Sequence, residues 1–141
     1  MSNIVKGRNL TDIKPPFVVL MVGIRVNRWW AIHKWFIVVF RFVQAIIDTE
    51  KNNPDLLACR YLFNWRQIVC VQYWRSAEAI SAFTSKPEGL HIKVWRYYNL
   101  SVSDSGAVGI WHETFFINDD SSECVYTNMP ILGLASKGQS E

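Results

Sequence analysis

The chain has 141 residues and a mass of 16.4 kDa, which is the size of a single domain. Half of its residues are hydrophobic and 19% are charged, which excludes a long disordered chain. The net charge is +3 and no block of Lys and Arg occurs, so no nucleic-acid partner is predicted. Seven tryptophans in so short a chain indicate either a dense aromatic core or a pocket for a flat, apolar ligand.

The two ends of the chain and the cysteines suggest a compartment and a domain boundary. The N-terminal sequence lacks the apolar segment that export requires, so we expect a cytoplasmic protein with three free thiols. Residues 1–16 carry no hydrophobic periodicity and are interpreted as a flexible N-terminal arm. Residues 17–135 are the single predicted domain, and residues 136–141 are a polar tail.

A strand and a long helix are predicted at the start of the domain. Phe17–Arg25 is a run of β-branched and large apolar residues, which is typical of a strand. Arg28–Lys51 is predicted to be a helix that stops before Asn52.

The apolar stretch 29–47 inside this helix is long enough to cross a bilayer, but charged residues interrupt it. Lys34, Arg41 and Asp48 recur every seven residues, which predicts one polar stripe on an otherwise apolar helix. We therefore expect an amphipathic helix that is largely buried. Contact of this helix with a membrane surface or a partner stays open.

A hairpin is predicted next, with strands Leu57–Phe63 and Arg66–Arg75 on either side of Asn64-Trp65. If these two residues form the turn, Cys59 lies directly opposite Cys70. Facing cysteines can approach disulfide distance, but in a reducing compartment we expect two adjacent thiols.

The second half of the domain begins with two helices. Ser76 is expected to cap a short helix that ends near Lys86-Pro87, and Leu90–Val102 is predicted to be a second helix. Strands are predicted over Val108–Ile117 and Glu123–Met129.

This order of elements predicts a fold class. Strand, helix, strand, strand, helix pair and strand, with one strand appended, is the split βαβ order of an α+β, ferredoxin-like fold with an antiparallel sheet. The helices then cover one face of the sheet, although the strands carry apolar residues on both faces. A second copy of the sheet is the simplest cover for the bare face, so we expect a homodimer that closes a dimeric α/β barrel.

Histidines are the candidate catalytic groups, because no Gly-rich phosphate loop, GxSxG, HExxH or CxxC motif occurs. His33, His91 and His112 are not spaced as metal ligands, so no metal is predicted. His112 and Glu113 lie inside an apolar strand, where each needs a partner or a cavity. They are either a satisfied core pair or an acid/base or ligand-contacting pair.

His91 lies one helical turn before Trp95. It is either a surface histidine packed on an indole or an imidazole in a cavity, where it acts as a general acid/base or an axial haem ligand. Two further clusters combine rings with cations or amides, which suits an anionic or conjugated ligand and equally suits ordinary core packing. One cluster lies at the first strand–helix junction and the other at the end of the hairpin. Their members are Arg25, Asn27, Arg28, Trp29, Trp30, His33, Lys34 and Trp35, and Gln72, Tyr73, Trp74 and Arg75.

These clusters also carry a family resemblance. The motifs are Asn27-Arg28-Trp29-Trp30, Gln72-Tyr73-Trp74-Arg75-Ser76, His91 with Trp95-Arg96, Gly109-Ile110-Trp111-His112-Glu113-Thr114, and Tyr126 with Asn128-Met129-Pro130. The set resembles the small monooxygenase-like family typified by the polyketide-cleaving monooxygenase of fungal fumagillin biosynthesis, in the dimeric α/β-barrel superfamily of the antibiotic-biosynthesis monooxygenases. The resemblance implies a homodimer, a pocket between each sheet and its helices, and a polyketide or aromatic substrate.

We therefore predict a small, cofactor-independent, monooxygenase-like enzyme of secondary metabolism that acts on a small apolar or aromatic intermediate. In some relatives a base removes an acidic proton and the resulting carbanion reacts with O₂ without metal or flavin. Here His112 or His91, with Glu113 beside His112, is the predicted acid/base group. Trp74, Trp95 and Trp111 are expected to shape the pocket, and Arg75 or Arg96 to hold enolate charge; the other expected substrate contacts are Gln72, Tyr73, Trp30, His33 and Asn27.

Three alternatives stay open. The first is a cofactor-free lyase, cyclase or dehydratase of the same fold, which oxygen consumption would distinguish. The second is haem binding through His91, His112 or His33. The third is a ligand-binding dimer without catalysis, in which residues 29–47 contact a membrane or a partner.

Overall fold

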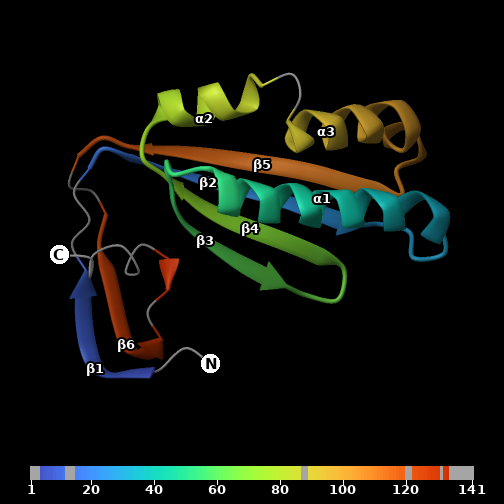
Figure 1. Ribbon diagram of the computed structural model, residues 1–141. Coiled ribbons are helices and arrows are strands. Elements are labelled where there is room, and N and C mark those ends of the chain that lie inside the picture. The colour runs from blue at the N-terminus through green and yellow to red at the C-terminus, as the bar shows by residue number, and fades with distance from the viewer. Residues whose placement is uncertain (1–3, 12–14, 87–88, 120–121, 131, 134–141) are drawn as a thin grey trace.

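The computed structural model describes residues 4–11, 15–86, 89–119, 122–130 and 132–133 (Figure 1). The strands are β1 (Ile4–Thr11), β2 (Phe17–Val26), β3 (Leu56–Phe63), β4 (Gln67–Trp74), β5 (Val108–Ile117) and β6 (Cys124–Pro130). The helices are α1 (Ile32–Asn52), α2 (Ala77–Thr84), α3 (Leu90–Ser101) and the short 3₁₀ helix η1 (Ser103–Ser105). A four-stranded sheet has the order β3–β4–β2–β5, and β1 and β6 form a separate two-stranded sheet.

The four-stranded sheet is antiparallel throughout, and α1, α2 and α3 lie on one of its faces. This arrangement agrees with the split βαβ fold predicted from the order of the elements. Ser76 caps α2 as predicted, because its Oγ accepts a hydrogen bond of 3.1 Å from the Ala79 amide.

The β3–β4 turn is longer than predicted. Phe63 pairs with Ile68 rather than with Arg66, so the prediction of a two-residue turn is wrong. The Asn64 side chain is the physical reason, since its Oδ1 accepts hydrogen bonds of 2.9 Å from the amides of both Arg66 and Gln67.

The longer turn moves the register of the cysteines by two residues. Cys59 pairs with Gln72 and Cys70 pairs with Tyr61, so the two cysteines are not direct cross-strand partners as predicted. A shift of two residues keeps every side chain on its face of the sheet. The two Sγ atoms therefore still lie 2.7 Å apart, and both residues are free thiols.

Residues 4–11 correct the expectation of an N-terminal arm. They form β1, which pairs with β6 although more than a hundred residues separate the two strands. The register shifts between Val5 and Arg8, where Gly7 has φ +88° and its amide donates to Asn128 Oδ1. The strand predicted over residues 123–129 is confirmed by β6, and the predicted polar tail lies outside the described residues.

Helix α1 packs on the sheet through Val38, Phe42 and Ile46, which join Ile24 and Cys70 in the main core. The helix is amphipathic as predicted, but it is less buried than predicted, because several of its large apolar side chains face solvent. Within the part of the chain that the structure describes, no helix is long and apolar enough to cross a membrane.

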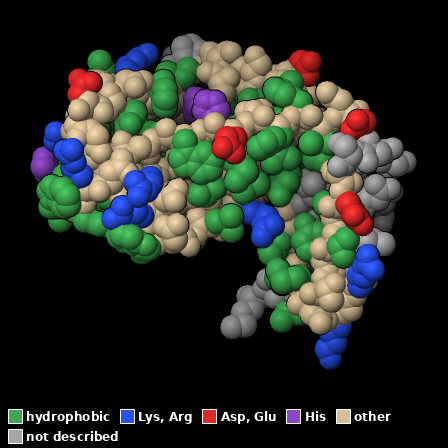
Figure 2. All heavy atoms as spheres, turned by 180° about the vertical axis from the view of Figure 1, so that it is seen from behind, with side chains coloured by type: hydrophobic (Ala, Val, Ile, Leu, Met, Phe, Trp, Pro, Cys, Tyr) green, Lys and Arg blue, Asp and Glu red, His purple; other side chains and the backbone are tan. Residues whose placement is uncertain are grey.

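Among the described residues, no helix lies on the sheet face opposite α1, α2 and α3. Strand alternation places on it Val19 and Met21 of β2, Val69, Val71 and Tyr73 of β4, and Trp111, Glu113 and Phe115 of β5. Figure 2 views the molecule from this side and shows hydrophobic side chains gathered over its middle. Gly23 is required here, because a Cβ at this position would lie 2.5 Å from the Trp111 ring.

Candidate active site

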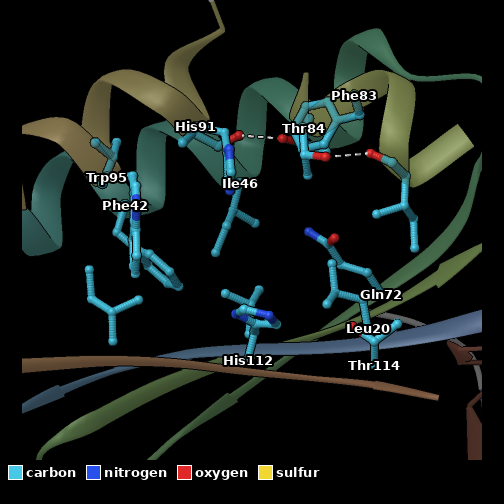
Figure 3. Close-up of a pocket in the computed structure, with 16 residues that line it drawn as sticks. Leu20, Phe42, Ile46, Gln72, Phe83, Thr84, His91, Trp95, His112 and Thr114 are labelled. Carbon is cyan, nitrogen blue, oxygen red and sulfur yellow. Dashed lines mark hydrogen bonds between the residues drawn. The ribbon is translucent and has the colours of Figure 1, made fainter. Parts of the chain in front are cut away.

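A cavity of about 340 Å³ lies between the helix-bearing face of the sheet and the three helices (Figure 3). This volume is in the range of small-molecule sites. The lining residues are Leu20 and Val22 of β2, Gln72 of β4, Ile110, His112 and Thr114 of β5, Phe42, Ala45, Ile46 and Thr49 of α1, Ile80, Phe83 and Thr84 of α2, and His91, Val94 and Trp95 of α3.

The lining is mostly hydrophobic. Its polar members are one amide, two imidazoles and three threonine hydroxyls, and none of these described lining residues is Asp, Glu, Lys or Arg. Apolar walls with a few polar groups suit an uncharged or weakly acidic ligand with flat, conjugated surfaces.

The two imidazoles point into the cavity from opposite walls. His91 comes from the first turn of α3, and His112 comes from the middle of β5 (Figure 3). The pKa of His91 is lowered from its usual value of about 6.5, first because burial disfavours the charged form and second because of the nearby charge of His112. His91 therefore remains neutral, and able to accept a proton, at a lower pH than an ordinary histidine.

Lowering the pH below about 6.5 is expected to destabilise the protein. The unfolded chain binds a proton at His91 below about pH 6.5, whereas the native chain resists it, so the free energy of unfolding falls as the pH drops below that value. His91→Gln removes this contribution. Urea unfolding at pH 7.5 and 5.5 should show a larger loss of stability for the wild type than for the variant. Equal losses would contradict the assignment.

Gln72 is held in one orientation. Its side chain is nearly buried, and its Oε1 accepts a hydrogen bond of 3.0 Å from Trp74 Nε1. An indole nitrogen can only donate, so this bond fixes which end of the amide is oxygen. The amide nitrogen is the other end, and the side chain projects toward the cavity (Figure 3). One N–H of this amide is directed at the Cys70 thiol, and the other can donate a hydrogen bond to an oxyanion in the cavity.

The cavity brings together four of the predicted site residues: His91, His112, Trp95 and Gln72. Trp74 is fully buried and packs on Phe83, with ring centroids 5.4 Å apart, so it contacts Gln72 and does not line the cavity itself. Sequence reasoning missed the contributions of α1 and α2, among them Phe42 and Phe83. Their signal was only that of ordinary core positions in amphipathic helices.

Three predicted site residues lie on the other face of the sheet. Glu113 and Trp111 alternate with His112 along β5 and so point away from the cavity, and Tyr73 does the same on β4. The predicted pairing of His112 with Glu113 at one site is corrected by this alternation. Tyr73 instead packs near Gly133, whose φ of +57° brings the chain close to the sheet.

The remaining predicted residues also lie outside the cavity lining. Arg75 forms an ion pair with Asp55 (Nε–Oδ1 3.4 Å), and Arg96 is exposed on α3. Asn27 donates to the Gly106 carbonyl and braces a loop. Trp30 and His33 are exposed near the start of α1.

A second cluster of titratable groups lies beneath α1. The Cys59 and Cys70 thiols share a hydrogen bond, which lowers the pKa of Cys59 and raises that of Cys70. Burial, followed by a hydrogen bond to Glu50 of 2.5 Å, raises the pKa of Tyr61. None of these residues lines the cavity.

Haem is a poor match for this cavity. Of the three histidines predicted as axial ligands, His33 lies outside it, which leaves His91 and His112. The described lining contains no Lys or Arg that could pair with the propionates of haem. We therefore derive no chemical step through haem.

Comparison with known proteins identifies the family. A family model described as monooxygenase af470-like matches residues 17–134. The chain belongs to the monooxygenase af470-like family. Monooxygenase af470 of Aspergillus fumigatus is 31% identical over 157 aligned residues, which cover 94% of this chain and 54% of that protein. The chain thus spans about half the length of this relative. The resemblance inferred from the motifs is confirmed.

Solved structures support the fold assignment. SnoaB, a cofactor-independent oxygenase from Streptomyces nogalater, superposes with a TM-score of 0.50 at 14% identity, covering 76% of this chain and 98% of SnoaB. A dimeric protein with a ferredoxin-like fold from Bacteroides fragilis gives 0.51 at 9% identity, covering 72% and 96%. The predicted α+β, ferredoxin-like fold with an antiparallel sheet is confirmed.

Proposed function

We propose that this member of the monooxygenase af470-like family is a cofactor-independent monooxygenase acting on a polyketide or aromatic intermediate that bears an acidic C–H group. The observation that carries the proposal is the placement of two imidazoles on opposite walls of a hydrophobic cavity (Figure 3). The family match and the fold likeness to a cofactor-independent oxygenase support it.

The reaction begins with proton transfer. His91, whose lowered pKa favours the neutral form, accepts the proton of an activated CH₂ group and leaves a carbanion whose charge is delocalised onto a neighbouring carbonyl oxygen. The Gln72 amide donates to that oxygen. It takes the role that the sequence suggested for Arg75 or Arg96.

Oxygen then adds to the carbanion. The carbanion carbon bonds to O₂, and His112 supplies the proton that converts the resulting peroxide anion into a hydroperoxide. Loss of the second C–H proton expels hydroxide from the O–O bond, which leaves a carbonyl group and, after protonation, water. The CH₂ group loses four electrons and O₂ gains four, so no external reductant is needed.

The stoichiometry of oxygen use tests this proposal. Anthrone is a suitable probe, because it combines flat rings with an acidic CH₂ group beside a carbonyl. Protein stripped of metals and flavin should consume one O₂ per carbonyl formed, and ¹⁸O₂ should place one labelled atom in the product. Turnover of a probe without oxygen uptake would instead indicate a lyase or cyclase.

We also propose that the working form is a homodimer assembled through the helix-free sheet face. Its apolar side chains support this proposal, because Phe115 is 47% exposed and Met21 and Val71 are half-buried, and an apolar patch open to solvent marks an interface. Met21→Lys places a charge at the centre of the face. The variant should be monomeric by light scattering at concentrations where the wild type and Val125→Lys, a change on β6, are dimeric. A dimeric Met21→Lys protein would contradict this interface.

A further inference from the structure

One end of the molecule exposes an unusual number of aromatic rings. Trp30, Phe63 and Trp65 are 79%, 71% and 69% exposed. Scattered exposed hydrophobic residues are normal in proteins, but a contiguous group of this size marks an interaction site. None of these three rings lines the cavity, so the proposed reaction gives them no role.

Helix α1 and the β3–β4 hairpin together form this surface. Trp29, just before α1, stacks on Trp65 of the hairpin, with ring centroids 6.3 Å apart and an angle of 21° between the rings. Both segments lie at the same end of the molecule (Figure 1). From there Ile32, Phe36 and Phe40 continue along one side of α1 at spacings of four residues, each more than half exposed.

The two segments that carry these rings contain basic residues and no acidic ones, and the exposed acidic residue Asp104 lies on the loop that contacts Asn27 and Arg28. Residues 17–47 contain no Asp or Glu, but they include Arg28, Lys34 and Arg41. Residues 56–76 likewise lack acidic residues, and the Arg66 guanidinium lies over the Trp65 ring at 3.9 Å from its centroid. Figure 2 shows basic and hydrophobic side chains together at this end of the molecule, on the left in that view.

We define the aromatic–basic surface as the exposed rings and apolar side chains of residues 29–40 and 63–65 with their neighbouring cations. We propose that this surface docks the protein on the face of an anionic lipid bilayer. Trp and Phe side chains are favoured at the level of the lipid headgroups, and cations are attracted to anionic lipids. The exposed side of α1 would lie in the plane of the interface.

Charge is the reason for choosing a lipid surface over a second copy of this chain. A twofold interface brings the same patch together from both subunits, so the cations of this surface would face each other, and neither residues 17–47 nor residues 56–76 supply an acidic partner. An anionic bilayer supplies the opposite charge along the whole surface. This proposal does not depend on the chemistry of the cavity.

Vesicle co-sedimentation tests the proposal. The full chain is expected to pellet with vesicles of phosphatidylcholine and phosphatidylserine and to remain in the supernatant with pure phosphatidylcholine. Each basic side chain near an anionic surface strengthens binding about fivefold, so Arg28→Gln combined with Lys34→Gln should weaken it about 25-fold. Lys93→Gln, a change of an exposed lysine on α3, is the matched charge control and should bind as the wild type does.

The rings are tested separately from the charges. Trp30→Ser and Phe36→Ser remove exposed side chains and should each weaken binding at least about threefold without changing the unfolding midpoint. Leu100→Ser, at an 80% exposed position on α3, is the matched control. Equal binding to neutral and anionic vesicles, or no binding to either, would overturn the proposal. A change in oligomeric state caused by Trp30→Ser would also overturn it, because the surface would then be an interface between copies.

Discussion

Replacing His91 by alanine is expected to lower turnover at least about a hundredfold, which is the usual contribution of a general base. The imidazole points into the cavity, and its lowered pKa keeps it in the form that accepts a proton. His112→Ala is expected to cost at least about tenfold, because the peroxide can also take a proton from water. The rate of O₂ consumption at saturating anthrone measures both effects.

The pH profile separates a base from a structural residue. In the wild type, kcat should fall at low pH as His91 becomes protonated, and this acid limb should disappear in His91→Ala. Asn99→Ala, an exposed change on the same helix, is the control and should keep the wild-type rate and profile. If both histidine variants turn over at the wild-type rate, neither imidazole takes part in the proton transfers proposed here.

Trp74→Ala is expected to destabilise the protein by about 3–5 kcal/mol, the usual cost of removing a large buried aromatic side chain. Trp74 is fully buried and packs with Val18 and Leu56 in the second core cluster, beneath α2. Its loss would leave a large void there and take the hydrogen-bond donor away from Gln72. Urea unfolding measures the free energy.

The conservative variant Trp74→Phe tests the positioning of Gln72. It keeps most of the ring volume and removes only the Nε1–H group, so the free energy of unfolding should fall by about 1–3 kcal/mol. If the hydrogen bond positions the Gln72 amide for the oxyanion, kcat should fall while KM changes little. An unchanged kcat in a folded Trp74→Phe protein would mean that Trp74 has only a structural role.

Much of the fold could be predicted from the sequence, because local patterns determine most of its elements. β5 has the predicted bounds, and the four-residue spacing of His91 and Trp95 does place both in the cavity. β1 was not predicted, because its pairing with β6 is a contact between the two ends of the chain that leaves no local pattern. The hairpin register was wrong because the Asn64 side chain stabilises a longer turn.

The candidate site could be predicted only in part. Alternation along β5 separates His112 from Glu113 and Trp111, but the sequence does not show which face the helices cover. Arg75 lies close in sequence to the cavity residue Gln72, but its guanidinium forms an ion pair with Asp55 outside the cavity lining. Tertiary packing decides both outcomes.

A structure of the protein with anthrone bound tests the central claim most directly. We expect the ligand in the cavity between the sheet and the helices, with its CH₂ carbon within proton-transfer distance of the His91 imidazole and its carbonyl oxygen within hydrogen-bond distance of the Gln72 amide nitrogen. A ligand bound elsewhere, or one in the cavity whose CH₂ group faces neither His91 nor His112, would contradict it.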